Sequence, residues 1–353
     1  MRALWVSTST STRGGVASVV RAFQETPLWT TWDIHHVATH RDGSVAARIA
    51  IFFTGSLKFL GELVLRRPDV VHIHMSSAGS FVRKCILTWL TRAFRIPVVI
   101  HMHGGGFDHF HDDSPKPVQR LIRATLEVSQ TVVALGDSWA VELRCIAPSA
   151  RIIVIPNAIR VGDPVVQPAP GEQVGVLFLG LVDEYKGTFV LIEAWSKIIA
   201  ELRDTAQAQL TIAGAGALDE AEKSIAALGV GDSVTMPGWI DPADVPDLLS
   251  KAQVLVLPSR MEGQPMAILE AMARGLCVVA SDVGGIPDLM DNTCGVLVSP
   301  DDVDGLASVL RTVVDDHATR ERLGTAARER ILRDFDIEIV WRKFDDLYRE
   351  LTA

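Results

Sequence analysis

The feature that most constrains the fold is an alternation of short apolar runs with longer helical patterns, which continues through all 353 residues. This alternation is typical of parallel β-sheets whose strands are joined by covering helices. The runs form two series, so we expect two sheets. The strands expected in the first sheet are Ala3–Ser7, Ile34–Ala38, Val70–His74, Val98–Met102, Val132–Leu135 and Ile152–Ile155, and those in the second are Val174–Leu179, Gln209–Ala213, Ser233–Met236, Gln253–Leu257, Cys277–Ala280 and Gly295–Val298.

A segment with little periodicity, residues 160–173, separates the two series. Its turn-favouring residues, typical of a linker, are Gly162, Pro164, Pro168, Pro170 and Gly171. The chain is also too long for one ordinary hydrophobic core. We therefore predict two Rossmann-like domains, whose ligands would bind at the carboxyl ends of the strands. The predicted bounds are 1–165 for the N-terminal domain, 166–335 for the C-terminal domain and 336–353 for a final helix that packs back on the N-terminal domain.

Charge is divided unevenly along the chain. Residues 1–165 contain 18 Lys and Arg against 12 Asp and Glu, whereas the remaining residues contain 16 against 31. The overall net charge of -9 thus hides a basic half joined to an acidic half. A basic half predicts an anionic partner, such as a membrane surface or a lipid diphosphate. Nucleic acid is not expected as a partner, because no basic run with interleaved aromatic residues occurs.

Composition and cysteine usage indicate a globular protein of a reducing compartment. Hydrophobic residues make up 48% and charged residues 22% of the chain, which is typical of a folded protein and not of a disordered one. The four cysteines lack the paired short spacing of zinc sites, and no secretory signal precedes the first expected strand. We expect a cytoplasmic protein.

The longest apolar stretch, Val45–Leu65, is interrupted by charged residues and so lacks the uninterrupted apolar length of a membrane-spanning helix. As an amphipathic helix it either packs on the first sheet or lies on the inner face of a membrane, and both hold if different faces serve each role. The apolar residues assigned to the lipid-facing surface are Phe52, Phe53, Leu57, Phe59, Leu60 and Val64, and the cations beside them are Arg48, Lys58, Arg66 and Arg67.

An anion site is predicted where the apolar run Val254–Leu257 ends. The run is typical of a buried parallel strand, and Pro265 suits the first position of a following helix. A helix N-terminus favours a phosphate through its unpaired N–H groups and its dipole. Two carboxylates, Glu262 and Glu270, bracket the site. The N–H groups that would face the anion are those of Gln264, Met266 and Ala267.

The stretch from Pro258 to Gly285 resembles the donor-binding segment of family 4 glycosyltransferases. The resemblance rests on the Pro-Ser pair, on two glutamates in the spacing Glu-x7-Glu, and on the apolar strand and Gly-Gly turn that follow. Members of this family have the GT-B fold, an α/β architecture of two Rossmann-like domains that face one another across a cleft, with a C-terminal helix that crosses back to the first domain. They retain the configuration of the transferred sugar.

The resemblance implies a donor site in the second half of the chain. Glu262 would hold the sugar hydroxyls, Glu270 would hold the ribose hydroxyls, and Lys186 would neutralise the leaving diphosphate. Family members commonly carry an arginine where this chain has Leu181, and Arg260 is a candidate substitute. The donor-binding residues implied in this way are Gly15, Lys186, Glu262, Gly263, Gln264, Pro265, Met266, Glu270, Trp239 and Ile240.

The first half supplies the expected acceptor side. The loop after the first expected strand ends in Gly14-Gly15, and the family places such a loop against the donor phosphate or the acceptor. Arg13 would help to hold an anionic acceptor. His103 matches a family histidine that touches the transferred sugar. The implied acceptor-binding residues are Arg13, Gly14 and His103, and the implied catalytic residues are His103, Glu262 and Lys186.

Histidine pairs and one acidic triplet raise the question of a metal. The pairs His72-x-His74, His101-x-His103 and His109-x-His111 each share a strand face at best, which does not complete a metal-ligand set. Enzymes of the GT-B fold work without a metal, so we expect no metal and no cofactor besides the nucleotide sugar. The triplet Asp302-Val303-Asp304 imitates the motif of metal-dependent glycosyltransferases, but its place at an expected helix start predicts a cap.

The predicted function is a hexosyltransferase that moves a hexose-type sugar from a nucleoside diphosphate, with UDP ranked ahead of GDP, to an acceptor hydroxyl. The resemblance to enzymes of exopolysaccharide or surface-glycan assembly implies a polyprenyl-diphosphate-linked or other glycan acceptor, with peripheral contact at the inner membrane face. Two alternatives stay open at this point. One is a nucleotide-sugar epimerase of the same fold, and the other is a sugar-binding protein without chemistry.

Overall fold

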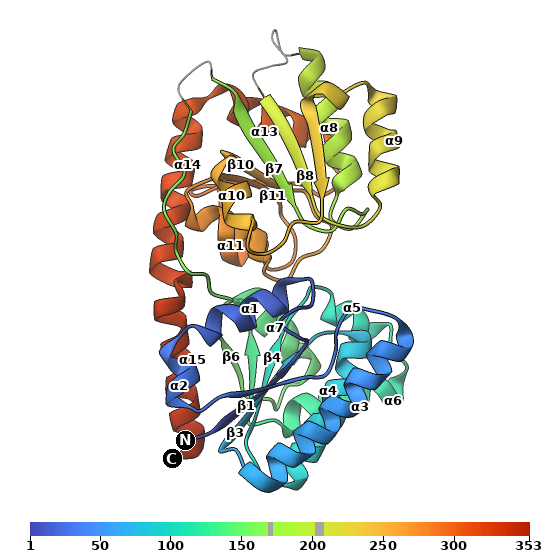
Figure 1. Cartoon of the computed structure of the whole chain (residues 1–353), viewed down its shortest axis with the longest axis vertical. Coiled ribbons are helices and arrows are strands. Elements are labelled where there is room, and N and C mark those ends of the chain that lie inside the picture. Colours follow the sequence, from blue (N-terminus) through green and yellow to red (C-terminus); the bar gives the residue numbers. More distant parts are fainter. Residues whose placement is uncertain (169–171, 202–207) are drawn as a thin grey trace. The chain divides into compact units, whose positions relative to one another are not determined.

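The computed structural model describes residues 1–168, 172–201 and 208–353, so Pro170 and Gly171 of the expected linker lie outside the described residues. The chain divides into two compact units (Figure 1). The first unit contains Met1–Arg160 and Phe335–Ala353, and the second contains Val161–Asp334. These divisions fall within a few residues of the boundaries drawn from the sequence.

The first unit is built on a parallel sheet of six strands in the order β2-β1-β3-β4-β5-β6. The order reverses between β1 and β3, because the chain adds β2 on one side of β1 and the later strands on the other. Such a switch point is where ligands bind in open α/β sheets. The strands are β1 (Ala3–Ser7), β2 (His35–Ala38), β3 (Val70–Met75), β4 (Val98–Met102), β5 (Thr131–Ala134) and β6 (Ile152–Val154).

One face of this sheet carries the main hydrophobic core of the unit. Leu4, Ile73 and Ile100 point from the strands into a cluster that includes Phe59 and Phe81 from the covering helices. The helices of the unit are α1 (Gly15–Gln24), α2 (Pro27–Thr31), α3 (Val45–Gly61) with the π-helical turn η1 (Glu62–Arg66), α4 (Ala78–Ala93), α5 (Phe107–Asp112), α6 (Lys116–Val128), α7 (Asp137–Ile146) and α15 (Ile337–Thr352).

The apolar stretch at residues 45–65 is helical, and one face of the helix is buried while the opposite face is exposed. Phe59 is fully buried in the core, so its assignment to a lipid-facing surface was wrong. The opposite stripe is open: Phe53 is 65% and Leu57 is 57% exposed. The spacing of four residues between them keeps both on one side of the helix. In the described part of the chain, no helix has the length and apolar character needed to cross a bilayer.

The C-terminal helix α15 completes the first unit on the other face of the sheet (Figure 1). The indole Nε1 of Trp5 in β1 donates a hydrogen bond to the hydroxyl of Tyr348 at 3.0 Å. Phe344 packs on Phe23 of α1 with ring centroids 5.3 Å apart. Residues 343 positions apart in the sequence therefore share one core, and the expectation that the last helix returns to the first domain is confirmed.

The second unit has the same architecture, with a parallel six-stranded sheet in the order β12-β11-β10-β7-β8-β9. Its switch point lies between β7 and β10. The strands are β7 (Val174–Leu179), β8 (Ala208–Ala213), β9 (Val234–Gly238), β10 (Val254–Leu257), β11 (Cys277–Ser281) and β12 (Val296–Val298). The helices are α8 (Thr188–Glu201), α9 (Leu218–Leu228), the 3-10 turn η3 (Gly231–Ser233), α10 (Val245–Ser250), α11 (Met266–Ala273), α12 (Ile286–Leu289), α13 (Val303–Asp315) and α14 (His317–Arg330) with the π-helical turn η4 (Ile331–Phe335).

Both sheets match the expectation of two Rossmann-like domains, and each strand begins and ends within one or two residues of the predicted bounds. The strands of the two sheet centres are almost wholly buried, as parallel sheets covered on both sides require. Most of their residues are apolar, but β3 and β4 also bury His72, His74 and His101.

Candidate active site

Lys186 and Glu262 meet at the switch point of the second sheet. Lys186 lies in the loop after β7 and Glu262 in the loop after β10, and these strands are neighbours in the sheet. The Nζ of Lys186 lies 2.5 Å from Oε1 of Glu262, and the same oxygen accepts a hydrogen bond of 2.8 Å from the hydroxyl of Ser259. The side chain of Glu262 is only 7% exposed, whereas that of Lys186 is 29% exposed. The cation therefore forms the solvent-facing side of the pair.

Two glycines allow the loops around this pair to approach one another. Gly187 has φ +72°, and a Cβ there would lie 1.9 Å from the carbonyl oxygen of Pro258. Gly284 has φ +54°, and a Cβ there would lie 2.0 Å from the carbonyl oxygen of Glu262. No other residue type fits either position without moving backbone. The contacts explain why glycine stands at positions 187 and 284 beside the loop that carries the glutamate.

The helix that follows Glu262 begins one residue later than predicted. Pro265 has φ -70° and ψ 125°, so it stands as an extended residue before α11, which starts at Met266. Pro265 therefore cannot be the first helical residue. The segment from Glu262 to Met266 is buried, and Glu270 lies one turn into the helix. The N-terminal N–H groups of α11 thus follow directly on the loop that holds Glu262.

Arg260, the candidate substitute for the cation missing at Leu181, is paired with acidic side chains. Its guanidinium donates to Asp301 at 2.8 Å and 3.0 Å and lies 3.2 Å from a carboxylate oxygen of Glu184. The hydrogen bond to Asp301 is the main cause that raises the pKa of Arg260. Its charge is already neutralised by two acidic side chains, while Leu181 is half exposed.

The remaining residues predicted for the second unit also follow the carboxyl ends of strands. Trp239 and Ile240 follow β9, and Trp239 is 42% exposed. At the start of α13, the carboxylate of Asp302 accepts a hydrogen bond of 2.8 Å from the N–H of Gly305. The interpretation of the acidic triplet as a helix cap is therefore confirmed.

In the first unit, the predicted acceptor residues follow β1 and β4. Gly14 has φ +122° and precedes α1, which starts at Gly15, and the backbone N–H of Arg13 donates to Asp42 at 2.9 Å. His103 is 4% exposed, and its backbone N–H donates to the carbonyl of Met75 at 2.7 Å. Burial lowers the pKa of His103 to about 3, so the imidazole is neutral at pH 7.

Three buried histidines form a group that could hold a metal ion. His72 and His74 of β3 and His101 of β4 each offer a ring nitrogen, and these atoms lie within 4.8 Å of one another. The group arises because β3 and β4 pair with His74 beside His101, which the separate His-x-His pairs did not reveal. Burial lowers the pKa of all three well below the usual value, and both ring nitrogens of His101 lack a hydrogen-bond partner among the described residues. Neutral imidazoles of this kind are metal ligands.

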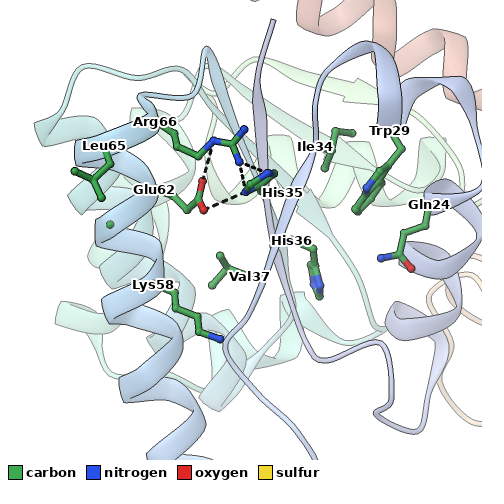
Figure 2. A pocket seen from close by; sticks show the side chains of 11 residues that line it. Gln24, Trp29, Ile34, His35, His36, Val37, Lys58, Glu62, Leu65 and Arg66 are labelled. Carbon is green, nitrogen blue, oxygen red and sulfur yellow. Dashed lines mark hydrogen bonds and ion pairs between the residues drawn. The ribbon is translucent and has the colours of Figure 1, made fainter.

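A pocket of about 590 Å³ opens along β2, the edge strand of the first sheet, and none of the predicted site residues lines it (Figure 2). At one end, Arg66 lies 2.6 Å from Asp33 and 3.8 Å from Glu62, which in turn lies 3.1 Å from Nδ1 of His35. Arg66 is thus held in an ion-pair network within its own unit. Its predicted place as a cation beside a membrane stays a prediction.

Two buried polar residues were not recognised from the sequence. Ser259 is fully buried and fixes Glu262, and it was noted only as half of a Pro-Ser pair. Lys84 is 2% exposed and lies among the buried residues of α4. The available signal was its spacing of three from Phe81 and four from Thr88, which places a lysine on the apolar face of an amphipathic helix.

Comparison with known proteins yields two family matches that together span most of the chain. Residues 16–162 match "Glycosyltransferase Family 4", and residues 163–330 match "Glycosyl transferases group 1". The boundary between the two matches falls next to the division between the two structural units at Arg160.

Among curated relatives, glycogen synthase of Mycobacterium tuberculosis is 30% identical over 299 residues, which cover 80% of this chain and 69% of the relative. Alpha-D-kanosaminyltransferase of Streptomyces kanamyceticus is 27% identical over 308 residues, covering 81% of this chain and 79% of the relative.

Solved structures share the fold. Sucrose-phosphate synthase from Thermosynechococcus elongatus is similar with a TM-score of 0.84 at 21% identity, covering 99% of this chain and 98% of that one. Anabaena HepE in complex with UDP and glucose is similar with a TM-score of 0.74 at 16% identity, covering 99% and 100%. The same fold is indicated by the two parallel α/β sheets, by the C-terminal helix that returns to the first unit and by these matches. The chain belongs to the family 4 glycosyltransferases and is an enzyme of the GT-B fold.

Proposed function

We propose that this glycosyltransferase moves a hexose-type sugar from a nucleoside diphosphate sugar, UDP ahead of GDP, to an acceptor hydroxyl with retention of configuration. The observation that carries the proposal is the pairing of Lys186 with Glu262 at the switch point of the second sheet, directly before α11. A cation, a helix N-terminus and a carboxylate at one switch point suit a diphosphate joined to a sugar. The similarity to HepE, whose structure contains UDP and glucose, supports UDP.

In the proposed reaction, Lys186 and the first N–H groups of α11 hold the diphosphate. Glu262 accepts hydrogen bonds from the sugar hydroxyls, and Glu270 accepts those of the ribose. The acceptor oxygen attacks the anomeric carbon from the face of the leaving group while the bond to the diphosphate oxygen breaks. That departing oxygen takes the acceptor proton, so neither a base nor a metal is needed. Lys186 stabilises the charge that develops on the diphosphate, which is the electrostatic form of catalysis.

Residues of the first unit take the acceptor side in this proposal. Arg13 and Gly14 bind the acceptor, Gly15 approaches the donor phosphate, and His103 contacts the transferred sugar. A neutral His103 suits this role, because a neutral imidazole can exchange a hydrogen bond with a sugar hydroxyl without adding a second positive charge. Trp239 and Ile240 contact the base of the nucleotide.

The proposed acceptor is a polyprenyl-diphosphate-linked or other glycan acceptor used in exopolysaccharide or surface-glycan synthesis, reached by peripheral contact at the inner membrane face. Exposed apolar residues along α3 support this contact, since Val45, Ile49, Phe53 and Leu57 recur every four residues and are 57% to 71% exposed. A second exposed stripe on α4 contains Val82, Ile86 and Trp89. Large exposed apolar surfaces next to cations are typical of peripheral membrane proteins.

The reaction is tested by incubating the enzyme with UDP-hexoses and a polyprenyl-diphosphate-linked sugar. We expect a glycosylated lipid with the anomeric configuration of the donor, read by mass spectrometry and by the proton coupling of the anomeric centre. An inverted product would contradict the proposed mechanism, and donor conversion to an epimer without acceptor would support the epimerase alternative.

Membrane contact is tested by vesicle flotation with phosphatidylcholine vesicles that contain an anionic phospholipid. We expect the wild type to float at low salt and the double variant Phe53→Ser with Leu57→Ser to stay in the dense fraction. The control substitution Val166→Ser, at an exposed apolar position of the second unit, should leave flotation unchanged. A wild type that never floats would contradict the membrane proposal.

A further inference from the structure

Three histidines of the first unit are buried on the sheet face that α15 covers. His72 and His101 are fully buried, and His74 is 3% exposed. The ring of Phe344 in α15 lies 5.2 Å from the ring of His72 and 5.4 Å from that of His101. Trp5 of β1 packs on His72 and His74, with ring centroids 4.6 Å and 4.9 Å away. The proposed transfer reaction gives these three imidazoles no role.

The ring nitrogens of these histidines are only partly hydrogen-bonded. In the described part of the chain, partners are lacking for Nε2 of His72, for Nε2 of His74 and for both ring nitrogens of His101. A neutral imidazole has one N–H donor and one acceptor nitrogen, and burying either without a partner opposes folding. Unpaired nitrogens on three neighbouring buried rings therefore indicate a missing partner that the three rings share.

The three rings are close enough to bind one ion. Each ring offers one nitrogen, and the three nitrogens lie within 4.8 Å of one another. The strand register places His74 of β3 beside His101 of β4, and His72 lies two residues back along β3 on the same face. A zinc ion with bonds of about 2.0 to 2.1 Å holds tetrahedral nitrogen ligands about 3.4 Å apart. Each nitrogen would therefore move by less than about 1 Å if the rings turned toward a common centre.

Two of the rings are held in orientation by their other nitrogen. Nδ1 of His72 is hydrogen-bonded with the hydroxyl of Tyr348 in α15, and Nδ1 of His74 lies 2.8 Å from Nε2 of His103. With the proton on Nδ1, each ring donates to its partner, and the lone pair of its Nε2 is available to an ion. Metal-binding histidines are ordinarily held in this way, with one nitrogen on the metal and the other donating a hydrogen bond.

We propose that His72, His74 and His101 bind one structural transition-metal ion, with Zn²⁺ as the occupant. Imidazole nitrogen is a ligand for zinc, copper and nickel, whereas Mg²⁺ and Ca²⁺ prefer oxygen ligands. The group formed by the described residues contains three imidazoles and neither a carboxylate nor a thiol. The ion belongs to the first unit, whereas Lys186 and Glu262 belong to the second. The proposed transfer reaction does not use it, so the inference goes beyond the proposed function.

The ion stabilises the packing of α15 on the first sheet. Tyr348 of α15 accepts a hydrogen bond from the indole of Trp5 in β1 and is bonded to His72, so a metal at His72 fixes a contact between the two ends of the chain. An ion that binds only the folded chain raises its stability. The site is therefore tested by metal content, by the spectrum of the bound ion and by stability.

The first measurement is the zinc content of the whole chain, produced without a histidine tag in medium that contains Zn²⁺, because a buried ion is best supplied during synthesis. After desalting, elemental analysis should find close to one zinc per chain in the wild type and less than about 0.1 in His101→Leu, which lacks one of the three ligands. His109→Gln, at an exposed histidine of α5, should keep the zinc. A wild type without zinc, or equal zinc in His101→Leu, would overturn the proposal.

Two further measurements keep the test valid if His101→Leu fails to fold. The wild type produced with Co²⁺ in place of Zn²⁺ should show the visible absorption bands of tetrahedral cobalt, and their absence would contradict the site. Tyr348→Phe removes only the hydroxyl that orients His72, so zinc affinity in competition with a chelator should fall about 10-fold to 100-fold. Tyr185→Phe is the control, because it removes the hydroxyl of the other tyrosine, which is 66% exposed. Equal zinc affinity in Tyr348→Phe and the wild type would contradict the proposed orientation of His72.

Thermal unfolding tests the structural role of the ion. Zinc-loaded wild type should unfold in its first transition about 5 °C above wild type produced in zinc-depleted medium, as expected for an ion at well over 100 times its dissociation constant. In His101→Leu the two preparations should unfold at the same temperature. Equal midpoints for the two wild-type preparations would show that the ion does not stabilise the first unit and would overturn the proposal. None of these measurements needs donor or acceptor, so they stand whether or not the proposed transfer reaction is found.

Discussion

Lys186 and Glu262, which are 76 residues apart in the sequence, form a direct ion pair at 2.5 Å between the loops that follow β7 and β10. Sequence reasoning had given these residues separate tasks, one at the diphosphate and one at the sugar. The pair means that the proposed donor enters a site whose cation and carboxylate already neutralise one another. The diphosphate must therefore compete with Glu262 for Lys186. Hydrogen bonds from the sugar hydroxyls replace part of the interaction that the carboxylate of Glu262 loses.

Removing the two partners of this pair should have unequal effects on stability. Lys186→Ala leaves a carboxylate that is 7% exposed and whose remaining side-chain partner in the described part of the chain is Ser259, whereas Glu262→Ala leaves a lysine that water can reach. We expect Lys186→Ala to lower the free energy of unfolding by about 2 kcal/mol and Glu262→Ala by less than about 1 kcal/mol, measured by urea denaturation. Both should reduce kcat/KM by at least about 100-fold.

The matched control is Lys197→Ala. Lys197 also forms a short ion pair, 2.6 Å to Asp304, but both side chains are exposed, so neither stability nor turnover should change measurably. Equal destabilisation by Lys186→Ala and Glu262→Ala would show that burial of the carboxylate does not set the stability of the pair.

Gly284→Ala should displace the loop that carries Glu262 and so reduce turnover. The added Cβ would meet the carbonyl oxygen of Glu262 at 2.0 Å, so the loop must shift and carry the carboxylate with it. A displacement of this kind costs about 100-fold in turnover when catalytic groups are misplaced. Steady-state kinetics with the donor would measure it. Gly229→Ala is the control, since Gly229 has a similar φ of +68° and open space around it; it should lose some stability but keep its activity. Full activity of Gly284→Ala would refute the packing argument.

Acid should destabilise the first unit through its buried histidines. Burial lowers the pKa of His36 to about 4 and that of His103 to about 3, and it lowers the pKa of His101 well below its usual value. In the unfolded chain these groups bind protons near pH 6.5, so stability falls as the pH drops below 6.5 and continues to fall until the folded pKa is reached. Each such histidine contributes about 1.4 kcal/mol per pH unit in that window.

Urea denaturation at pH 7.0 and pH 5.0 measures this slope. Replacing His101 by leucine should reduce the loss between the two pH values by about 2 kcal/mol, because one buried histidine no longer charges in the unfolded state. His109→Gln, at an exposed histidine of α5, should leave the loss unchanged. An identical pH dependence in His101→Leu and the wild type would rule out His101 as a source of acid sensitivity.

Chelation with EDTA tests whether turnover requires a metal ion, and therefore whether a metal held by the histidine group takes part in the reaction. Because Lys186 and the start of α11 are proposed to neutralise the diphosphate, turnover should persist in excess EDTA. If EDTA abolished turnover and a divalent cation restored it, the proposed chemistry would be wrong. His101→Leu would then show whether the ion binds at His72, His74 and His101, because loss of one ligand should lower the metal content measured by elemental analysis.

The sheets were predictable from sequence because burial on both faces leaves a nearly continuous apolar run at each central strand. The expected strand Gln253–Leu257 and the strand β10 coincide apart from one residue at the start. The Gly-Gly turn after β11 was also recognisable, since only glycine tolerates the backbone and the close contact at Gly284.

Pairings between distant residues were not predictable. Arg66 was expected beside lipid and Arg260 was a candidate for a missing cation, but neither pattern indicated that Asp33 and Asp301 would bind them from 33 and 41 residues away. The histidine group depends on the register between β3 and β4, which no single strand pattern contains. Lys84 was missed because a charge on an apolar helix face is ordinarily expected to reach solvent.

The most direct test of the account is a calorimetric titration of the enzyme with UDP, GDP and ADP, repeated with Lys186→Ala and with the control Lys197→Ala. The account predicts that UDP binds most tightly, that Lys186→Ala weakens this binding by at least about tenfold, and that Lys197→Ala leaves it unchanged. Equal UDP affinity in the wild type and Lys186→Ala, or no binding of any of the three nucleotides, would contradict the assignment of the donor site to Lys186 and Glu262.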